Sequence, residues 1–218
     1  MFPDLLTDDA FRLETGRLWL RWPRMADAAA IAKYAGEKAV SQYTLRIPHP
    51  YGSEDARRFI HSCRSLNAKG DSIGLALTRK TKPGEVIGMI GAKPEGDGEI
   101  GIAYWLAAPL WGQGYMAEAL DEFAALLFTV TCTQGLLGIV RTENEASRNL
   151  LLSRGFSKSG DRLLAMPVRG GVFPCEEFRL SHADWRRREE SRFRRVTGHA
   201  AVTARRAAFA GGETKLSA

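Results

Sequence analysis

The sequence is poor in cysteine and has no long apolar run. Its three cysteines are odd in number and widely spaced, which indicates neither a disulfide framework nor a zinc site: Cys63, Cys132 and Cys175. No apolar run approaches the roughly 20 residues that a membrane-spanning helix needs. The acidic start, Met1 to Asp4, lacks the basic flank and apolar centre of a signal peptide. We therefore expect a cytoplasmic protein with no metal site and no membrane partner.

The formal net charge of +6 is concentrated near the C-terminus. The segment from Arg186 to Ala218 holds nine basic and three acidic residues, which accounts for the whole excess. A basic segment can bind nucleic acid, but here acids and alanines separate the arginines, which favours a solvated helix or a subunit-contact arm. We expect one domain at residues 1–184 and a basic, helical extension at 185–218. A homodimer involving this extension is one alternative for it, and nucleic-acid binding is the less favoured one.

The apolar periodicities predict an α+β domain. The expected strands are 17–22, 72–78, 85–92, 99–106, 135–142, 163–168 and 172–180, and the expected helices are 27–36, 53–66, 115–127 and 146–153. The three strands between 72 and 106 are predicted to be antiparallel, with turns at 82–84 and 94–98. A helical crossover separates 99–106 from 135–142, so these two strands should be parallel neighbours.

Several local features are predicted within this framework. Asp27 is expected to cap the first helix, and residues 40–51 are expected to form a loop. The apolar face of the helix at 53–66 is predicted from its spacing: Ala56, Phe59, Ile60, Cys63 and Leu66.

A glycine turn, Trp111-Gly112-Gln113-Gly114-Tyr115, separates the strand at 99–106 from the strongly amphipathic helix that follows. Closely spaced glycines let the backbone approach a ligand, and the first amides of a helix attract anions. The turn lacks the Lys-Ser/Thr pair of a P-loop and the third glycine of a dinucleotide fingerprint. A ligand containing a pyrophosphate is therefore expected, and a tight turn without a ligand is the alternative.

Several motifs in this order resemble those of the GNAT acetyltransferases, and most closely the branch of ribosomal-protein-alanine N-acetyltransferases. They are Tyr104-Trp105-Leu106, the glycine turn, Glu118-Ala119-Leu120, Asn144-x-x-Ser147 and Gly155-Phe156. The segment from Ile47 to Tyr51, with Asp55 and residues 57–59, is similar to the acceptor-side segment of that branch. The resemblance covers residues 13–180. It implies a mixed, mostly antiparallel sheet with one splayed parallel strand pair and about four flanking helices.

The resemblance implies that acetyl-CoA is the co-substrate and assigns residues to it. The pyrophosphate would be held by backbone amides of Gly112, Gln113, Gly114, Tyr115, Met116 and Ala117, and the pantetheine arm would pair with Leu106, Ala107 and Ala108. The thioester would enter where the parallel strands splay, around residues 138–141. Asn144 corresponds to a CoA-contacting Asn, although a helix cap is an equal and compatible role. Arg148 could meet a phosphate or lie solvated on its helix.

Two residues depart from the pattern of this family. Met116 stands where a small residue is usual, so it either narrows the phosphate approach or belongs to the core. Leu151 stands where many members have the tyrosine that protonates the leaving thiolate, which leaves the general acid unassigned.

The implied reaction is direct attack by a primary amine on the thioester of acetyl-CoA. The acceptor stays open between a protein N-terminus and a small amine, and a catalytically idle acyl-CoA-binding module is the alternative. Glu99 is the predicted general base. The family's acid could instead correspond to Gly101, which would make Glu99 a substitute or a bystander. Glu176, Glu177 and His49 are weaker candidates.

Overall fold

The structure, a computed structural model, describes residues 2–192. The chain divides into two compact units, Met1–Ser181 and His182–Ala218. Of the second unit, residues 182–192 are described, and they are helical. The rest of the predicted basic extension lies outside the described residues, so its contribution to a dimer stays a prediction.

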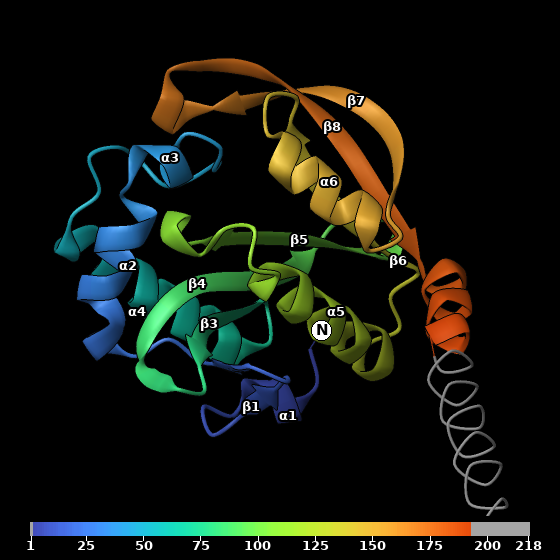
Figure 1. Cartoon of the computed structure of the whole chain (residues 1–218), viewed down its shortest axis with the longest axis horizontal. Helices are drawn as coiled ribbons and strands as arrows, with labels where there is room; N and C mark the ends of the chain where they lie inside the picture. Colours follow the sequence, from blue (N-terminus) through green and yellow to red (C-terminus); the bar gives the residue numbers. More distant parts are fainter. Residues whose placement is uncertain (1, 193–218) are drawn as a thin grey trace, which may run out of the picture. The chain divides into compact units, whose positions relative to one another are not determined.

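The first unit is built on one eight-stranded sheet in the order β1-β2-β3-β4-β5-β6-β8-β7 (Figure 1). Neighbouring strands are antiparallel except β5 and β6, which are parallel. The predicted mixed sheet with one parallel pair is thus confirmed. The strands are β1 (Arg12–Glu14), β2 (Leu18–Arg21), β3 (Ile73–Arg79), β4 (Lys82–Pro94), β5 (Glu99–Leu106), β6 (Gly135–Arg141), β7 (Ser157–Met166) and β8 (Gly171–Ser181).

Helices cover both faces of the sheet. They are α1 (Asp4–Thr7), α2 (Ala28–Ala35), α3 (Lys38–Ser41), α4 (Ser53–Lys69), α5 (Tyr115–Val130) and α6 (Glu145–Ser153). In Figure 1, α5 and α6 lie in front of the strands and α4 lies behind them. Two glycines of the sheet allow a helix side chain to pack close to the strand backbone. A Cβ at Gly74 would lie 2.5 Å from Cys63 Sγ of α4, and one at Gly138 would lie 2.8 Å from Leu151 Cδ1 of α6.

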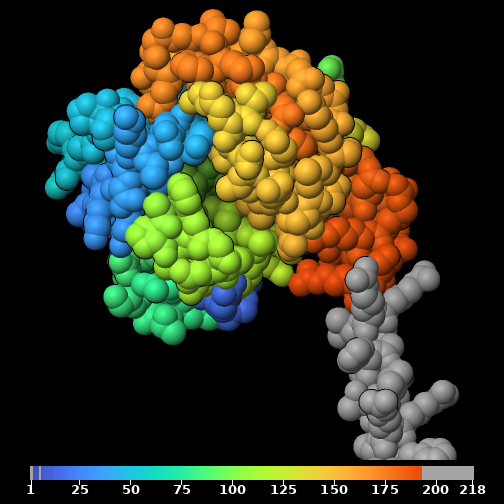
Figure 2. All heavy atoms as spheres, turned by 45° about the horizontal axis from the view of Figure 1, so that its top comes forward, coloured from blue at the N-terminus to red at the C-terminus, as the bar shows by residue number. Residues whose placement is uncertain are grey.

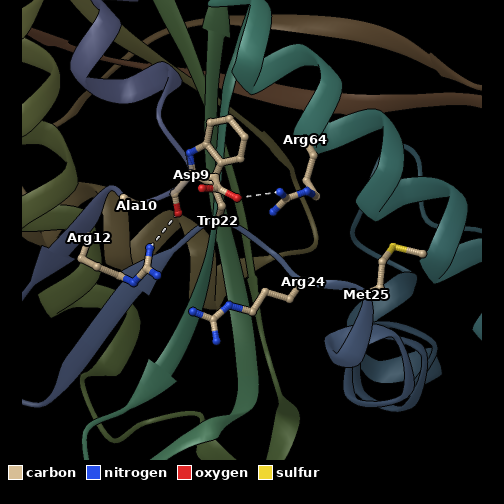
Figure 3. A pocket seen from close by; sticks show the side chains of 7 residues that line it. All are labelled: Asp9, Ala10, Arg12, Trp22, Arg24, Met25 and Arg64. Atoms are coloured by element: carbon tan, nitrogen blue, oxygen red, sulfur yellow. Dashed lines mark hydrogen bonds and ion pairs between the residues drawn. The ribbon is translucent and has the colours of Figure 1, made fainter.

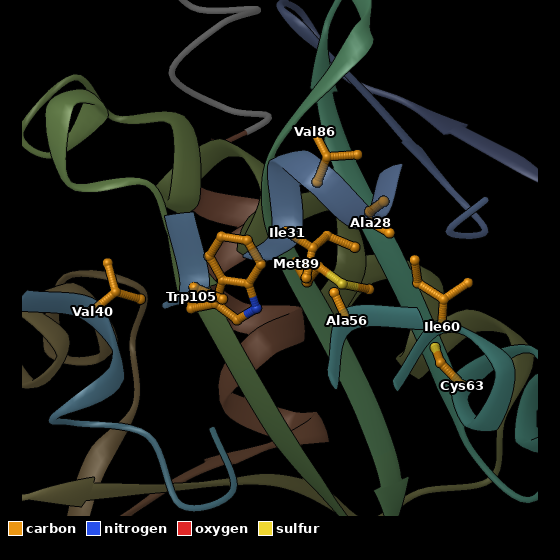
Figure 4. Close-up of a cluster of buried hydrophobic side chains, with 11 residues drawn as sticks. Ala28, Ile31, Val40, Ala56, Ile60, Cys63, Val86, Met89 and Trp105 are labelled. Atoms are coloured by element: carbon orange, nitrogen blue, oxygen red, sulfur yellow. The ribbon is translucent and has the colours of Figure 1, made fainter. Parts of the chain in front are cut away.

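The core between the sheet and the pair α2 and α4 is continuous (Figure 4). It includes Ile31 of α2, Ile60 of α4, and Met89 and Trp105 of β4 and β5. On α5, every residue of the predicted apolar face is buried: Met116, Ala119, Leu120, Phe123, Ala124 and Leu127. Burial of a large apolar side chain contributes roughly 1.5–3 kcal/mol. This explains why the spacing on α5 predicted the helix correctly.

Some local predictions were wrong. Asp27 precedes α2 but makes no side-chain cap to it within the described chain. Instead, its buried carboxylate accepts hydrogen bonds from the Arg21 guanidinium at 2.8 and 2.9 Å and from the Arg24 amide at 2.7 Å. A buried carboxylate needs such an opposite charge, whereas a helix amide can be left to water.

Other differences concern boundaries and faces. The segment predicted as a loop at 40–51 begins inside the short helix α3. The turn between β3 and β4 lies at residues 80–81, because register shifts near Thr78 extend β4 back to Lys82. Phe59 and Leu66 of α4 are each 39% exposed, so the buried stripe of this helix is narrower than predicted.

Candidate active site

The start of α5 presents backbone amides without helical acceptors. Gly112 and Gly114 have φ angles of 73° and 77°, which favour glycine. The first α5 hydrogen bond runs from the Glu118 amide to the Gly114 carbonyl at 3.1 Å, and within the described residues no side chain caps Gly114. The amides of the first three helical residues therefore remain available. Since a Cβ at Gly112 would meet no atom within 4 Å, the approach to this turn is open.

Arg17, which the sequence analysis missed, fastens this turn to the sheet. Its guanidinium donates to Gln113 O at 3.0 Å and to Glu118 Oε2 at 2.7 Å, and it stacks over the Tyr115 ring. Burial alone would raise the pKa of Glu118, but hydrogen bonds from Thr15 and Arg17 lower it below its ordinary value. The Glu118 carboxylate therefore stays ionised, and the paired Arg17 guanidinium offsets its negative charge near the helix start.

The parallel strands β5 and β6 part halfway along their length. Their pairing runs from Glu99 with Gly135 to Ile102 with Gly138, and both strands continue beyond that pair. The predicted splay between them is therefore present. Figure 2 shows a hollow between the lime-green segment around the glycine turn and the yellow helix α6, with the green of β5 at its bottom.

Some backbone groups at the end of β5 already have hydrogen-bond partners within the protein. The Ala107 amide donates to Ile87 O at 2.8 Å, on the β4 side, and the Leu106 carbonyl accepts from Trp111 Nε1 at 2.8 Å. The Ala107 amide thus points away from the opening, which disfavours its predicted pairing with an extended ligand. By strand alternation, the amides of Tyr104 and Leu106 face the opening instead. Ala108 lies in the 3₁₀ turn Ala108–Leu110, and its carbonyl accepts from the Trp111 amide.

Helix α6 closes one side of the opening. Asn144 Oδ1 accepts from the Ser147 amide at 3.1 Å, so the predicted cap is present and leaves the Asn144 side-chain amide nitrogen for another partner. Arg148 Nε donates to Glu176 Oε2 at 2.8 Å, and its guanidinium also reaches Thr142 O. These bonds direct Arg148 to β8 and to the residue that follows β6, which disfavours the predicted phosphate contact.

The predicted catalytic carboxylates all form ion pairs with arginine or lysine side chains. Glu99 accepts from Arg179 Nε at 3.0 and 3.1 Å, and this bond raises the pKa of Arg179. Glu177 pairs with Arg162 Nε at 3.0 Å and with Arg179 Nη1 at 3.1 Å. Glu176 is held by Arg148 and by Lys158 Nζ at 2.9 Å. None of these three described carboxylates is free to exchange protons without losing an ion pair.

Two arginines from the C-terminal half of the sheet hold the segment between α3 and α4. The Arg169 guanidinium donates to the carbonyls of Ser41 and, at 2.7 Å, Ile47. Arg141 Nη1 donates to Gln42 O at 2.7 Å. His49, a weak catalytic candidate, lies exposed with its Nδ1 2.9 Å from Gly36 O. This segment borders the face of the sheet opposite α6.

A concave region of about 610 Å³ lies elsewhere, on the side of the sheet near β1 (Figure 3). Its lining residues are Asp9, Ala10, Arg12, Trp22, Arg24, Met25 and Arg64. Arg64 Nη2 donates to Asp9 Oδ2 at 2.9 Å, and Arg12 Nη1 donates to Asp9 O at the same distance. No residue of β5, α6 or the glycine turn lines it, so it is separate from the strand opening.

Comparison with known proteins identifies this arrangement. Residues 17–157 match the profile of the acetyltransferase (GNAT) domain. The chain belongs to the GNAT family. It is also 31% identical over 152 residues to the uncharacterized N-acetyltransferase YoaA of Bacillus subtilis, covering 68% of this chain and 84% of that one.

Solved structures share the GNAT fold. RimJ of Mycobacterium smegmatis, in complex with CoA-disulfide, has a TM-score of 0.68 at 20% sequence identity. The aligned region covers 78% of this chain and 88% of the RimJ chain. The microcin C7 self-immunity acetyltransferase MccE, in complex with acetyl-CoA and AMP, has a TM-score of 0.67 at 16% identity, covering 76% and 93% of the two chains. At these identities the likeness establishes the fold.

The two departures from the GNAT pattern are resolved structurally. Met116 is 6% exposed and points into the core, so only its backbone lies at the glycine turn. Leu151 is fully buried against Gly138, where the pairing of β5 and β6 ends. Beside it, the Tyr104 hydroxyl lies 2.9 Å from Ser147 Oγ, and burial raises the pKa of Tyr104 to about 12. An apolar side chain thus lies at the position predicted to correspond to the family's acid.

Among residues 2–192, no helix is both long and apolar enough to cross a membrane. Within the same range, no group of three or more histidine, cysteine or acidic side chains is arranged to hold a metal ion.

Proposed function

We propose that the protein transfers an acetyl group from acetyl-CoA to a primary amine. The observation that carries this proposal is the coincidence of two features, the uncapped start of α5 and the opening between β5 and β6. The first suits a pyrophosphate, because helix-start amides and the helix dipole favour a negative charge. The second offers strand amides to an extended arm. Family membership supports acetyl-CoA as the donor.

In this proposal, the amides of residues 112–117 hold the pyrophosphate and Arg17 fixes their positions. The amides of Tyr104 and Leu106 pair with the pantetheine arm, and the side-chain amide of Asn144 contributes from α6. With these contacts, the thioester would lie near Ile102, where the strands part. Backbone amides aimed at the thioester oxygen would stabilise the charge that develops there during attack.

The proposed chemistry does not require a protein general acid. A free thiol has a pKa of roughly 8.5, so a thiolate leaves readily and can take its proton from water or from the attacking nitrogen. Positioning of the amine and the thioester supplies much of the rate. The buried Leu151 at the usual acid position is therefore compatible with activity.

The acceptor is proposed only as a class, a protein N-terminus or a small primary amine. The fold is shared with ribosomal-protein acetyltransferases, and this favours including N-terminal peptides among the candidates. A panel of peptides and small amines, assayed by release of free thiol from acetyl-CoA, tests the proposal. Turnover with at least one amine is the expected result.

A catalytically idle acyl-CoA-binding module is the second candidate, and the apolar Leu151 is the observation that favours it. Titration calorimetry with CoA, run beside the thiol assay, separates the two candidates. Binding of CoA without turnover on any acceptor would refute the transferase and support the binding module.

A further inference from the structure

One end of the central strand lacks a covering helix on the face that carries α2 and α4. Trp105 and Met89 are paired neighbours on this face and are buried in the core. Two residues earlier on β5, Ala103 is exposed although its strand is central, and its partner is Gly91. The next residue on this face, Gly101, pairs with Lys93. Gly91, Ala103 and Gly101 therefore form a patch of the sheet, here called the floor, that is accessible from the face of α2 and α4.

The carboxyl group of Glu95 lies on this floor. A Cβ built at Gly101 would lie 2.7 Å from Glu95 Oε1 and 2.8 Å from Glu95 Cγ. Side-chain atoms essentially never approach so closely, so Glu95 occupies the space that a side chain on residue 101 would fill. A carboxylate is thus present over Gly101 although the strand supplies none there.

The turn between β4 and β5 brings Glu95 to this position. The Glu95 amide donates to Glu99 O at 2.9 Å, which closes a tight loop. Within it, Asp97 and Gly98 have φ angles of 61° and 75°, which reverse the chain direction. The Glu95 side chain is thereby folded back over β5, one residue before Ile102, where the pairing with β6 ends.

Glu95 is also better placed to exchange a proton than Glu99. Glu99 lies two residues further from the strand opening, and both of its oxygens are within 3.1 Å of Arg179 Nε. Glu95 Oε1 is paired with Lys93 Nζ at 2.8 Å, and the Lys93 side chain is 51% exposed. A solvent-exposed ion pair of this kind contributes little free energy, so an incoming ammonium group can replace Lys93 at modest cost.

We propose that Glu95, rather than Glu99, is the catalytic carboxylate that binds the acceptor ammonium and takes its proton. This assignment rests on the proposed acetyltransferase function. The ammonium gives one proton to the Glu95 carboxylate, and the resulting amine attacks the thioester carbonyl carbon. A C–N bond forms and the C–S bond breaks, while the thiolate takes the second nitrogen proton. The products are the amide, the free thiol and one proton, which Glu95 returns to water.

The test compares isosteric variants of the two carboxylates. Glu95→Gln is expected to lower kcat/KM for the acceptor by about 10²-fold, the lower end of the range for a lost general base. It should also remove the acidic limb of the pH profile of kcat/KM. Glu99→Gln is expected to change kcat/KM by less than about threefold. The acetyl-CoA affinity, measured by calorimetry, should differ by less than about twofold between the two variants.

Two further variants separate chemistry from a structural role. Lys93→Met removes the ion pair of Glu95 and keeps its carboxylate, so activity should be retained. The double variant Glu95→Ala/Gly101→Glu supplies a carboxylate from the strand itself and should recover at least about tenfold of the activity that Glu95→Ala loses. Such recovery is not expected if Glu95 merely stabilises the turn.

The outcomes are distinguishable. A large loss in Glu99→Gln with little change in Glu95→Gln overturns this assignment and leaves the proposed function intact. An equal loss in Lys93→Met and Glu95→Gln, without recovery in the double variant, shows a structural role and also overturns it. If the wild-type protein turns over no amine, the proposed function fails and the assignment of Glu95 fails with it.

Discussion

Substitution of Gly112 by alanine tests whether the glycine turn binds a phosphate-containing ligand. Gly112 has a φ of 73°, and no atom lies within 4 Å of a Cβ built there. The left-handed conformation costs a non-glycine residue roughly 1–2 kcal/mol, while the added methyl group meets only solvent in the free protein. Gly170, with a φ of 70° and equally open space, offers a matched control in the turn between β7 and β8.

Both variants should therefore lose a similar free energy of unfolding, about 1–2 kcal/mol, measured by urea denaturation. Their CoA affinities should differ. In Gly112→Ala the methyl group lies on the surface that the pyrophosphate approaches, and we expect the Kd for CoA to rise at least tenfold, equivalent to about 1.4 kcal/mol. In Gly170→Ala the Kd should stay within about twofold of wild type. Equal CoA affinities in the two variants would refute the assignment of the pyrophosphate to this turn.

Three other predictions follow from contacts described above. Met116→Ala should lower the free energy of unfolding by about 2–5 kcal/mol, yet leave CoA affinity unchanged in the folded protein; weaker CoA binding at unchanged stability would contradict the burial of this side chain. Because hydrogen bonds hold the pKa of Glu118 below its unfolded value, its contribution to stability is present above about pH 4.3 and disappears as pH falls through the folded pKa. Glu118→Gln should therefore show a shallower loss of stability below pH 4.3 than wild type in acid titrations, and parallel curves would argue against this. Arg169→Ala should speed amide hydrogen exchange at residues 41–47, whereas unchanged exchange would show that other contacts hold this segment.

The sequence was most informative where one apolar period governed a whole element. The spacing on α5 and the limits of β5 were predicted correctly, because burial of one face determines both. The parallel pairing of β5 with β6 followed from the length of the helical crossover between them. Such features depend on residues close together in the chain.

The predictions that failed depend on partners that a periodic pattern does not contain. Asp27 was assigned to a helix cap because its buried partner, Arg21, lies outside the helical pattern. Arg17 was missed because its acceptors at the glycine turn are about a hundred residues away. The position of Glu95 depends on how the turn before β5 folds back, and Gly101 alone gave only the hint of a missing side chain.

The arginine contacts to the segment between α3 and α4, which is predicted to lie on the acceptor side, bear on any attempt to change acceptor specificity. Apart from a hydrogen bond from Arg169 to the Thr44 hydroxyl, Arg169 and Arg141 donate to main-chain carbonyls of this segment, so these contacts depend chiefly on its backbone path. Point substitutions at the exposed residues 45 and 46 should therefore be tolerated. A graft that changes the backbone would remove these main-chain acceptors from both guanidinium groups, and burial already lowers the pKa of Arg169. Transplanted acceptor specificity should accordingly require residues 36–52 together with the β7–β8 turn, exchanged as one cassette.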